Sequence, residues 1–146
     1  SREPDLEELF LELTKKTDIW KIMLTNLTLI VSSVLFNAIA QIFLKTGMTS
    51  LAPLNASVST FKTAQYIIFN PFNILGFICY GVSIVIWLWV LSKVEVSFAY
   101  PFQALGYILV TILAWMIFNE QINILRIIAL IFISIGLIIL AMSART

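Results

Sequence analysis

Long apolar segments alternate with short polar ones along this chain. Four apolar segments are about 20 residues long, which is the length that an α-helix needs to cross the roughly 30 Å hydrocarbon core of a bilayer. They cover residues 22–44, 72–91, 97–118 and 122–142. The pattern therefore predicts an all-α fold, a four-transmembrane-helix bundle.

The connections between these spans differ in length. Residues 92–96 and 119–121 are such short links that the helices they join must be antiparallel neighbours. The link over residues 45–71 is longer and contains Gly47, Pro53 and several serines and threonines. We predict a surface loop there, with a short interfacial helix over residues 61–69.

The segment before the first span has a helical pattern of its own. Its apolar residues fall at i, i+3, i+4 and i+7, behind Pro4 and Asp5; they are Leu6, Leu9, Phe10 and Leu13. We predict that residues 1–21 form an amphipathic interfacial helix lying flat on the membrane, ahead of a transmembrane domain at 22–146. A helix that docks on another protein or domain is the alternative.

Composition agrees with a membrane protein. Of the 146 residues, 60% are hydrophobic and 12% are charged, against about 45–50% and about 25% in soluble domains. The net charge of +1, without clustered Lys and Arg, argues against a nucleic-acid partner. There is no histidine and one cysteine, Cys79, so we expect no metal site, no disulfide framework and no cofactor.

Charge also predicts orientation. Positive residues gather on the cytoplasmic side of membrane proteins. One side of the predicted bundle would carry Lys15, Lys16, Lys21, Lys93 and Arg145, and the other Lys45, Lys62 and Arg126. We therefore expect both termini in the cytoplasm.

Polar residues inside the predicted spans are the main functional signal, because hydrocarbon disfavours them unless they face a protein interior or a wet cavity. Three stripes recur at helical spacing. They are Ser33, Asn37, Gln41 and Lys45 in the first span, Tyr80, Ser83 and Trp87 in the second, and Tyr100, Gln103, Tyr107 and Thr111 in the third. The stripes predict a polar groove with Lys45 and Arg126 as cations near one mouth, suited to a phosphate. Interhelical hydrogen bonding without any ligand is the alternative.

The fourth span has a different character. Small residues lie among Ile and Leu, and Ala129, Ile133, Gly136 and Leu140 share one face. This face suits close packing within the bundle or against a second subunit. No carboxylate lies mid-membrane, and Glu120 is the only candidate near a helix end. Because nucleophiles and metal ligands also lack an arrangement, we do not expect an enzyme.

Short motifs add a resemblance to a known family. Ala40-Gln41 with Lys45, Ala99-Tyr100-Pro101 and Asn119-Glu120 resemble the small multidrug resistance-type branch of the drug/metabolite transporter superfamily. Within that branch the chain is most similar to the small subunits of the aminoarabinose-phosphoundecaprenol flippase. Multidrug members carry a membrane-embedded glutamate where this chain has Asn37, which argues against proton-coupled drug export.

The resemblance implies a flippase subunit that moves a polyprenyl-phosphate-linked sugar across the bacterial inner membrane. Cations would meet the phosphate, amides the sugar hydroxyls, and aromatic rings the sugar face. The predicted substrate-binding residues are Asn37, Gln41, Lys45, Trp87, Tyr100, Gln103, Tyr107, Glu120 and Arg126.

The resemblance also implies partners: we expect a homodimer or a pair with a related subunit, and the N-terminal segment would tether the subunit to a glycosyltransferase or another pathway partner. Two alternative functions stay open. One is an exporter of cationic or metabolite substrates, and the other is a membrane scaffold subunit that does not transport.

Overall fold

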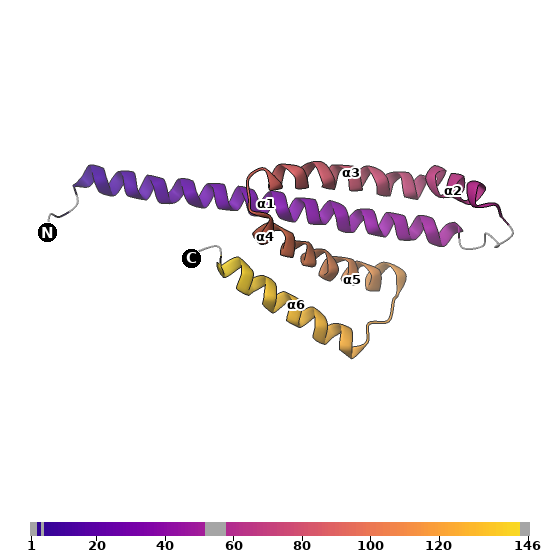
Figure 1. The fold of residues 1–146 in the computed structure, drawn as a ribbon. Coiled ribbons are helices and arrows are strands. Elements are labelled where there is room, and N and C mark those ends of the chain that lie inside the picture. The colour runs from indigo at the N-terminus through magenta and orange to yellow at the C-terminus, as the bar shows by residue number, and fades with distance from the viewer. Residues whose placement is uncertain (1–2, 4, 52–57, 144–146) are drawn as a thin grey trace.

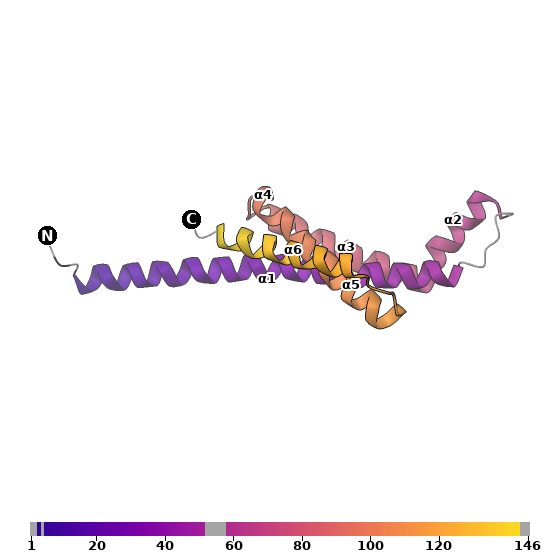
Figure 2. The ribbon, with the colours of Figure 1, turned by 90° about the horizontal axis from the view of Figure 1, so that it is seen from below.

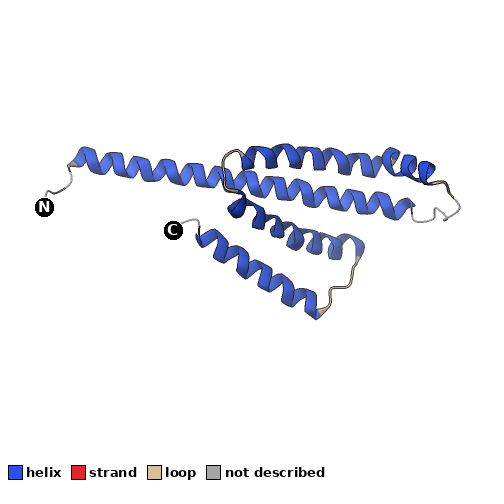
Figure 3. Cartoon of the chain, in the orientation of Figure 1, coloured by secondary structure: helices blue, strands red, loops and turns tan. Residues whose placement is uncertain are grey.

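The computed structural model describes residue 3 and residues 5–51 and 58–143. Within these residues every regular element is helical (Figure 3). The elements are α1 (Leu6–Leu51), α2 (Thr60–Phe69), α3 (Pro71–Leu91), α4 (Val96–Ala99), the 3₁₀ helix η1 (Tyr100–Gln103), α5 (Ala104–Phe118) and α6 (Ile124–Ser143). The predicted all-α fold is confirmed.

In the part of the chain that the structure describes, four helical segments are long and apolar enough to cross a membrane: α1, α3, the continuous run Val96–Phe118, and α6. The chain is therefore a multi-pass membrane protein. Successive spans run in opposite directions (Figure 1). We call the end with the α3–α4 turn and the C-terminus of α6 the α3–α4 end, and the opposite end the α5–α6 end. The helix predicted over residues 61–69 is also present, as α2.

The first helix is longer than its predicted span. It has 46 residues, and it continues beyond residue 44 to Leu51. The prediction that the surface loop begins at residue 45 was wrong. Glycine disfavours a helix by about 1 kcal/mol relative to alanine, but at Gly47 it lets α3 pack closely, as described below. The rest of the predicted loop before Val58, with Pro53, lies outside the described residues.

The N-terminal half of α1 also differs from expectation. Instead of a separate helix lying flat, it continues straight into the first span and extends past the bundle (Figures 1 and 2). Its apolar side chains are open, with Leu6 84% and Phe10 70% exposed. The division of the chain at residue 21 stays a prediction.

Buried serines begin the packing of α1 against α3. The Ser33 hydroxyl donates to the Ser83 carbonyl at 3.0 Å. The two hydroxyl oxygens also lie 3.2 Å apart, so either hydroxyl can donate to the other. The Ser83 hydroxyl donates to the Ser33 carbonyl at 2.8 Å. Small polar residues of this kind let two helices in a membrane approach closely and bond to each other.

Glycines continue this contact toward the α5–α6 end. A Cβ on Gly76 would lie 3.2 Å from the Ala40 carbonyl oxygen and 2.8 Å from Leu44 Cγ. A Cβ on Gly47 would lie 1.9 Å from Oδ1 of Asn73, which is fully buried. Ser33, Ala40 and Gly47 are seven residues apart, so they face α3 at every second turn. We call this row of contacts the α1–α3 seam.

Asn73 explains how a polar side chain is accommodated in the seam. Its Nδ2 donates to the Ile67 carbonyl at 2.8 Å, which ties α2 to α3. Its Oδ1 is buried and has no hydrogen-bond partner among the described residues. Since Oδ1 occupies the place of a Gly47 Cβ, it faces a Cα hydrogen of Gly47, a weak but recurrent acceptor contact between helices.

The third and fourth spans are packed less tightly. At the α3–α4 end an apolar cluster joins α1, α3 and the third span through Ile30, Val90, Ala99 and Phe102, and side chains of α6 reach it. The rest of α6 has no buried residue. Its surface is thus left to lipid or to another protein.

We expect Gly47→Ala to destabilise the protein, because the added methyl group would push Asn73 off its hydrogen bond to Ile67. Overpacking of this kind costs about 1–3 kcal/mol. Thermal unfolding of the detergent-purified chain measures it. The control is Gly81→Ala, where a Cβ would meet nothing within 4 Å. Equal stability of the two variants would contradict the close contact at Gly47.

Candidate functional site

A cavity of about 570 Å³ lies between α1, α3 and the third span. It combines polar side chains with small and apolar ones. Its lining residues are Val34, Asn37, Ala38, Gln41, Tyr80, Tyr100, Gln103, Gly106, Tyr107 and Val110. Small-molecule sites in proteins are commonly about 300–1,000 Å³ and mix an apolar wall with a few polar groups.

The first helix supplies the amides, and its geometry explains which residues of the predicted stripe reach the cavity. Residues four apart on an α-helix are rotated by about 40° from one another, since each residue turns about 100°. Ser33 therefore faces the α1–α3 seam, while Asn37 and Gln41 turn progressively toward α5. The stripe predicted on the first span thus lies on two faces of α1: Ser33 is in the seam, and Asn37 and Gln41 are in the cavity.

The third span supplies its polar groups through a change of helix type. Pro101 lacks a backbone N–H, and the chain winds as a 3₁₀ helix over Tyr100–Gln103 before α5 begins. Residues three apart are eclipsed in a 3₁₀ helix, so Tyr100 and Gln103 lie above one another on the cavity side. Tyr107 follows one turn of α5 later.

The polar groups of the cavity are not satisfied by each other. Within the described residues, no hydrogen bond involves the side chains of Asn37, Gln41, Tyr80, Tyr100, Gln103 or Tyr107. The Thr111 hydroxyl, by contrast, donates to the Tyr107 carbonyl of its own helix. At membrane depth, groups without partners require water or a ligand. The cavity is therefore suited to a hydroxyl-rich molecule.

A cation lies beyond the cavity toward the α5–α6 end. Lys45 follows Gln41 by one helical turn, about 6 Å along α1. Its ammonium group forms a salt bridge with the Glu120 carboxylate and lies 5.5 Å from the centre of the Phe118 ring. Both charged side chains stay partly open, at 52% and 34% exposure.

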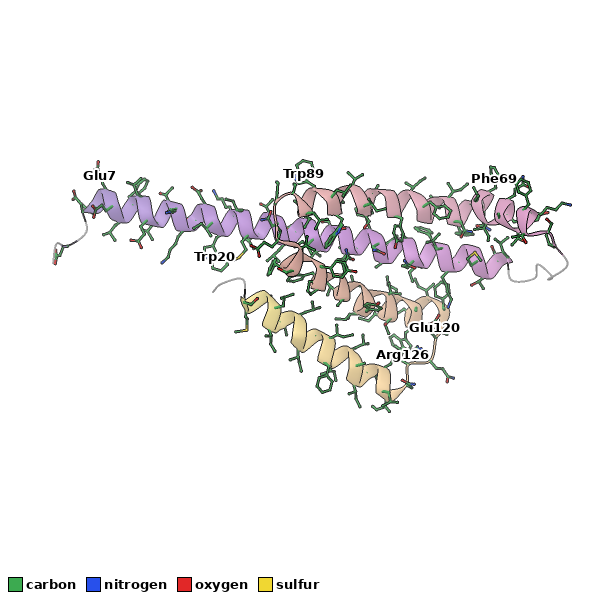
Figure 4. The ribbon with its side chains drawn as sticks, viewed as in Figure 1. Glu7, Trp20, Phe69, Trp89, Glu120 and Arg126 are labelled. Atoms are coloured by element: carbon green, nitrogen blue, oxygen red, sulfur yellow. The ribbon has the colours of Figure 1, made fainter. Side chains whose placement is uncertain are left out.

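Glu120 is held in its charged form by these neighbours. The hydrogen bond from Lys45 lowers the pKa of Glu120, and the charges of Lys45 and Arg126 add to the effect, against an opposing contribution from desolvation. Arg126 lies in the first turn of α6, and Figure 4 places it near Glu120 beside the α5–α6 turn. The Glu120 carboxylate thus lies under the influence of two cations.

The nine predicted substrate-binding residues fall into three groups. Asn37, Gln41, Tyr100, Gln103 and Tyr107 line the cavity together. Lys45, Glu120 and Arg126 lie at the α5–α6 end. Trp87 is instead partly buried against the apolar cluster.

Tyr80 is a lining residue that was not among the predicted site residues, although it belongs to a predicted stripe. Residues three apart share one face of a helix, and Ser83 faces α1. The spacing of Tyr80 from Ser83 could therefore have placed Tyr80 toward α1, where it lines the cavity. Gly106 could not be found from sequence patterns. A Cβ there would be 3.6 Å from Val34 Cγ1, so the glycine marks the close approach of α5 to α1.

Metal ligation finds no support in the described part of the chain, where no group of three His, Cys, Asp or Glu could hold an ion. The described site residues can bind a ligand through hydrogen bonds from their amides and hydroxyls, through stacking on tyrosine rings, and through charge.

The Lys45–Glu120 salt bridge should be sensitive to acid. Its contribution is present above the ordinary carboxyl pKa of 4.5 and is lost as the pH falls through the lowered pKa of the folded state. We expect Glu120→Gln to lower the melting temperature at about pH 7 and to leave it unchanged at about pH 3.

Thermal unfolding in detergent at both pH values measures this difference. Glu95→Gln, at the other end of the bundle, is the matched control. If Glu120→Gln lowered the melting temperature in acid as well, the Glu120 side chain would act by packing and not by charge.

Comparison with known proteins gives a partial match. The chain is 35% identical over 75 residues to the probable 4-amino-4-deoxy-L-arabinose-phosphoundecaprenol flippase subunit ArnE of Pseudomonas aeruginosa (strain UCBPP-PA14), which is 51% of this chain and 65% of the relative. It is 39% identical over 70 residues to proteins of the same name in Salmonella paratyphi B and Salmonella typhimurium, covering 48% of this chain and 63% of each relative.

The matches thus span less than two thirds of these relatives' length. No family model matches the chain. No solved structure matches it either. The resemblance predicted from the sequence motifs is confirmed: over about half of its length, this chain is similar to small subunits of the aminoarabinose-phosphoundecaprenol flippase.

Proposed function

We propose that this chain is a flippase subunit that carries a polyprenyl-phosphate-linked sugar across the bacterial inner membrane. The observation that carries the proposal is the open cavity of about 570 Å³, whose amides and phenols lack partners among the described residues. The relatives' name, a flippase subunit for an aminoarabinose linked to phosphoundecaprenol, supports the same reading.

The geometry suits a lipid-linked head group. The sugar hydroxyls would bond Asn37, Gln41 and Gln103, and the rings of Tyr100 and Tyr107 would cover the sugar face. Both tyrosines are open, at 65% and 70% exposure, so the lipid tail can stay in the bilayer while the head group enters.

The phosphate would be met by Lys45, one turn beyond Gln41. Lys45 must first leave the Glu120 carboxylate, because a phosphate and a carboxylate compete for the same ammonium group. Arg126 is close enough to influence Glu120 and would keep that carboxylate neutralised during the exchange. The ion pair would thus hold Lys45 in place before the substrate arrives.

Two other functions are less well supported. Proton-coupled export of cations relies on a carboxylate inside the membrane, and the described residues that line the cavity include no acid. A scaffold that does not transport would use its polar residues for packing, as Ser33 and Ser83 do. The cavity side chains are not used in that way among the described residues.

We further propose that the subunit works as a homodimer or with a related subunit, with both termini in the cytoplasm. Support comes from α6, which has no buried residue and presents Gly136 in open space. Arg145, part of the predicted cytoplasmic charge, lies outside the described residues. The projecting start of α1 would be the attachment point for a glycosyltransferase.

Reconstitution into liposomes with a radiolabelled polyprenyl-phosphate sugar tests the flippase function. We expect the chain, with its partner subunit where one is needed, to speed transbilayer movement, read as access of a membrane-impermeant reagent. Lys45→Ala, Gln41→Ala and Gln103→Ala should each slow it about tenfold or more, since each removes a hydrogen bond to a charged or sugar group.

The matched control is Lys62→Ala on α2, an exposed lysine outside the cavity. It should transport like the unmodified chain. Unchanged rates in all three variants, Lys45→Ala, Gln41→Ala and Gln103→Ala, would favour the scaffold. Movement of a soluble cation with a proton gradient, and none of the lipid, would favour the exporter.

The pairing through α6 has its own test. Gly136→Ile places a branched side chain on the face expected to approach the second subunit, and we expect the dimer fraction to fall by about fivefold or more in detergent cross-linking. Gly81→Ile on α3 is the control, also in open space. An equal loss from both variants would place the interface elsewhere.

A further inference from the structure

Two adjoining cavities lie at the α3–α4 end, away from the polar cavity. Their volumes are about 440 and 510 Å³, and both are lined by Asn26 and Lys93. The smaller is completed by Lys21, Ile22 and Thr25. The larger is completed by Val94, Glu95, Ser97, Phe98, Leu140 and Ser143. We call the pair the lysine pocket.

Both lysines of this pocket keep their charge open to a ligand. Lys93 lies in the α3–α4 turn with its ammonium group 5.2 Å from the centre of the Trp89 ring, a contact that orients the cation without neutralising it. Among the described residues, neither Lys93 nor Lys21 forms an ion pair. Two cations therefore face one concave surface.

The neutral polar groups define what the pocket can bind. The Thr25 hydroxyl donates to the Lys21 carbonyl, so its hydrogen is already used. Asn26 lines both cavities, and its amide adds N–H donors beside the lysines. Ammonium and amide donors around a small concave site recognise phosphate oxygens.

The pocket also lies at the level where lipid phosphates are found. Lys21 directly precedes the first predicted span, and Lys93 separates two spans. Trp20 and Trp89 lie at this end of the bundle (Figure 4), as aromatic residues do at membrane interfaces. Ile22, Phe98 and Leu140 add an apolar wall, which a free phosphate ion would not use but an acyl or prenyl chain would.

From these observations we propose that the lysine pocket binds the phosphate group of an anionic membrane lipid. Lys21 and Lys93 hold the phosphate, the Asn26 amide donates to it, and the apolar wall receives the start of the lipid chain. The proposal does not depend on the flippase function. Basic pockets between membrane helices on the cytoplasmic side are a recurrent way of holding such head groups.

Glu95 opposes this binding. Glu95 lines the larger cavity, where its negative charge repels a phosphate, whereas among the described residues no acid lines the smaller cavity beside Lys21. Removing the charge of Glu95 should therefore strengthen lipid binding. Damage to the fold would not produce an effect of that sign.

The test is a titration of the full-length, detergent-purified chain with phosphatidylglycerol, counting bound lipid by native mass spectrometry. We expect Lys21→Gln and Lys93→Gln each to weaken binding about fivefold, and the double variant about 30-fold. Glu95→Gln should tighten binding. Lys62→Gln, which removes the same charge from α2, should bind like the unmodified chain.

Further arms identify the source of the phosphate. Phosphatidylcholine should not bind, and polyprenyl phosphate binding with the same lysine dependence would also support a lipid-phosphate site. Displacement of the lipid by millimolar inorganic phosphate would overturn the proposal in favour of a free-anion site. Equal loss in Lys62→Gln and in the pocket variants would overturn it too, because net charge alone would then account for binding.

Discussion

The close approach of α1 to α3 is the constraint on which the rest of the structure depends. Each contact of the seam requires a residue without bulk: Ser33 against Ser83, Ala40 against Gly76, and Gly47 against Asn73. Hydrocarbon gives helices no hydrophobic reason to associate, so tight packing and hydrogen bonds must hold them together. Because the seam fixes the rotation of α1, the adjacent face of this helix, with Asn37 and Gln41, is turned toward the third span.

The cavity follows from this division of faces. Asn37 and Gln41 lie beside the seam and not within it, and among the described residues no group of α3 forms a hydrogen bond with their amides. Beside the cavity, the third span comes close to α1 at Gly106, next to Val34. Elsewhere its tyrosines and Gln103 stand off and leave open space. If these polar residues served packing alone, we would expect them to form hydrogen bonds between the helices, as Ser33 and Ser83 do in the seam.

The transmembrane spans were easier to predict from the sequence than the contacts between them. Span number and approximate bounds follow from the length of apolar segments, which the membrane itself dictates. The continuation of α1 to Leu51 could not be predicted, because Gly47 looks like a loop residue until Asn73 of another helix is placed beside it. Six residues of the stripes predicted from helical spacing line the cavity, but Trp87 shared that spacing and packs against the apolar cluster. The contact of Lys45 with Glu120 joins residues 75 positions apart, which no local pattern encodes.

The uninterrupted course of α1 has a mechanical consequence. The helix contains no proline and is about 69 Å long, with about 40 Å between Leu6 and Ser33 and about 27 Å between Ser33 and Leu51. The seam holds the second half of this helix against α3 from Ser33 to Gly47, while the first half projects beyond the bundle. Because sharp kinks need a proline or a similar interruption, the two halves form one continuous rod. The same small residues that hold Gln41 and Lys45 beside the third span therefore also set the direction in which Leu6 and Phe10 project.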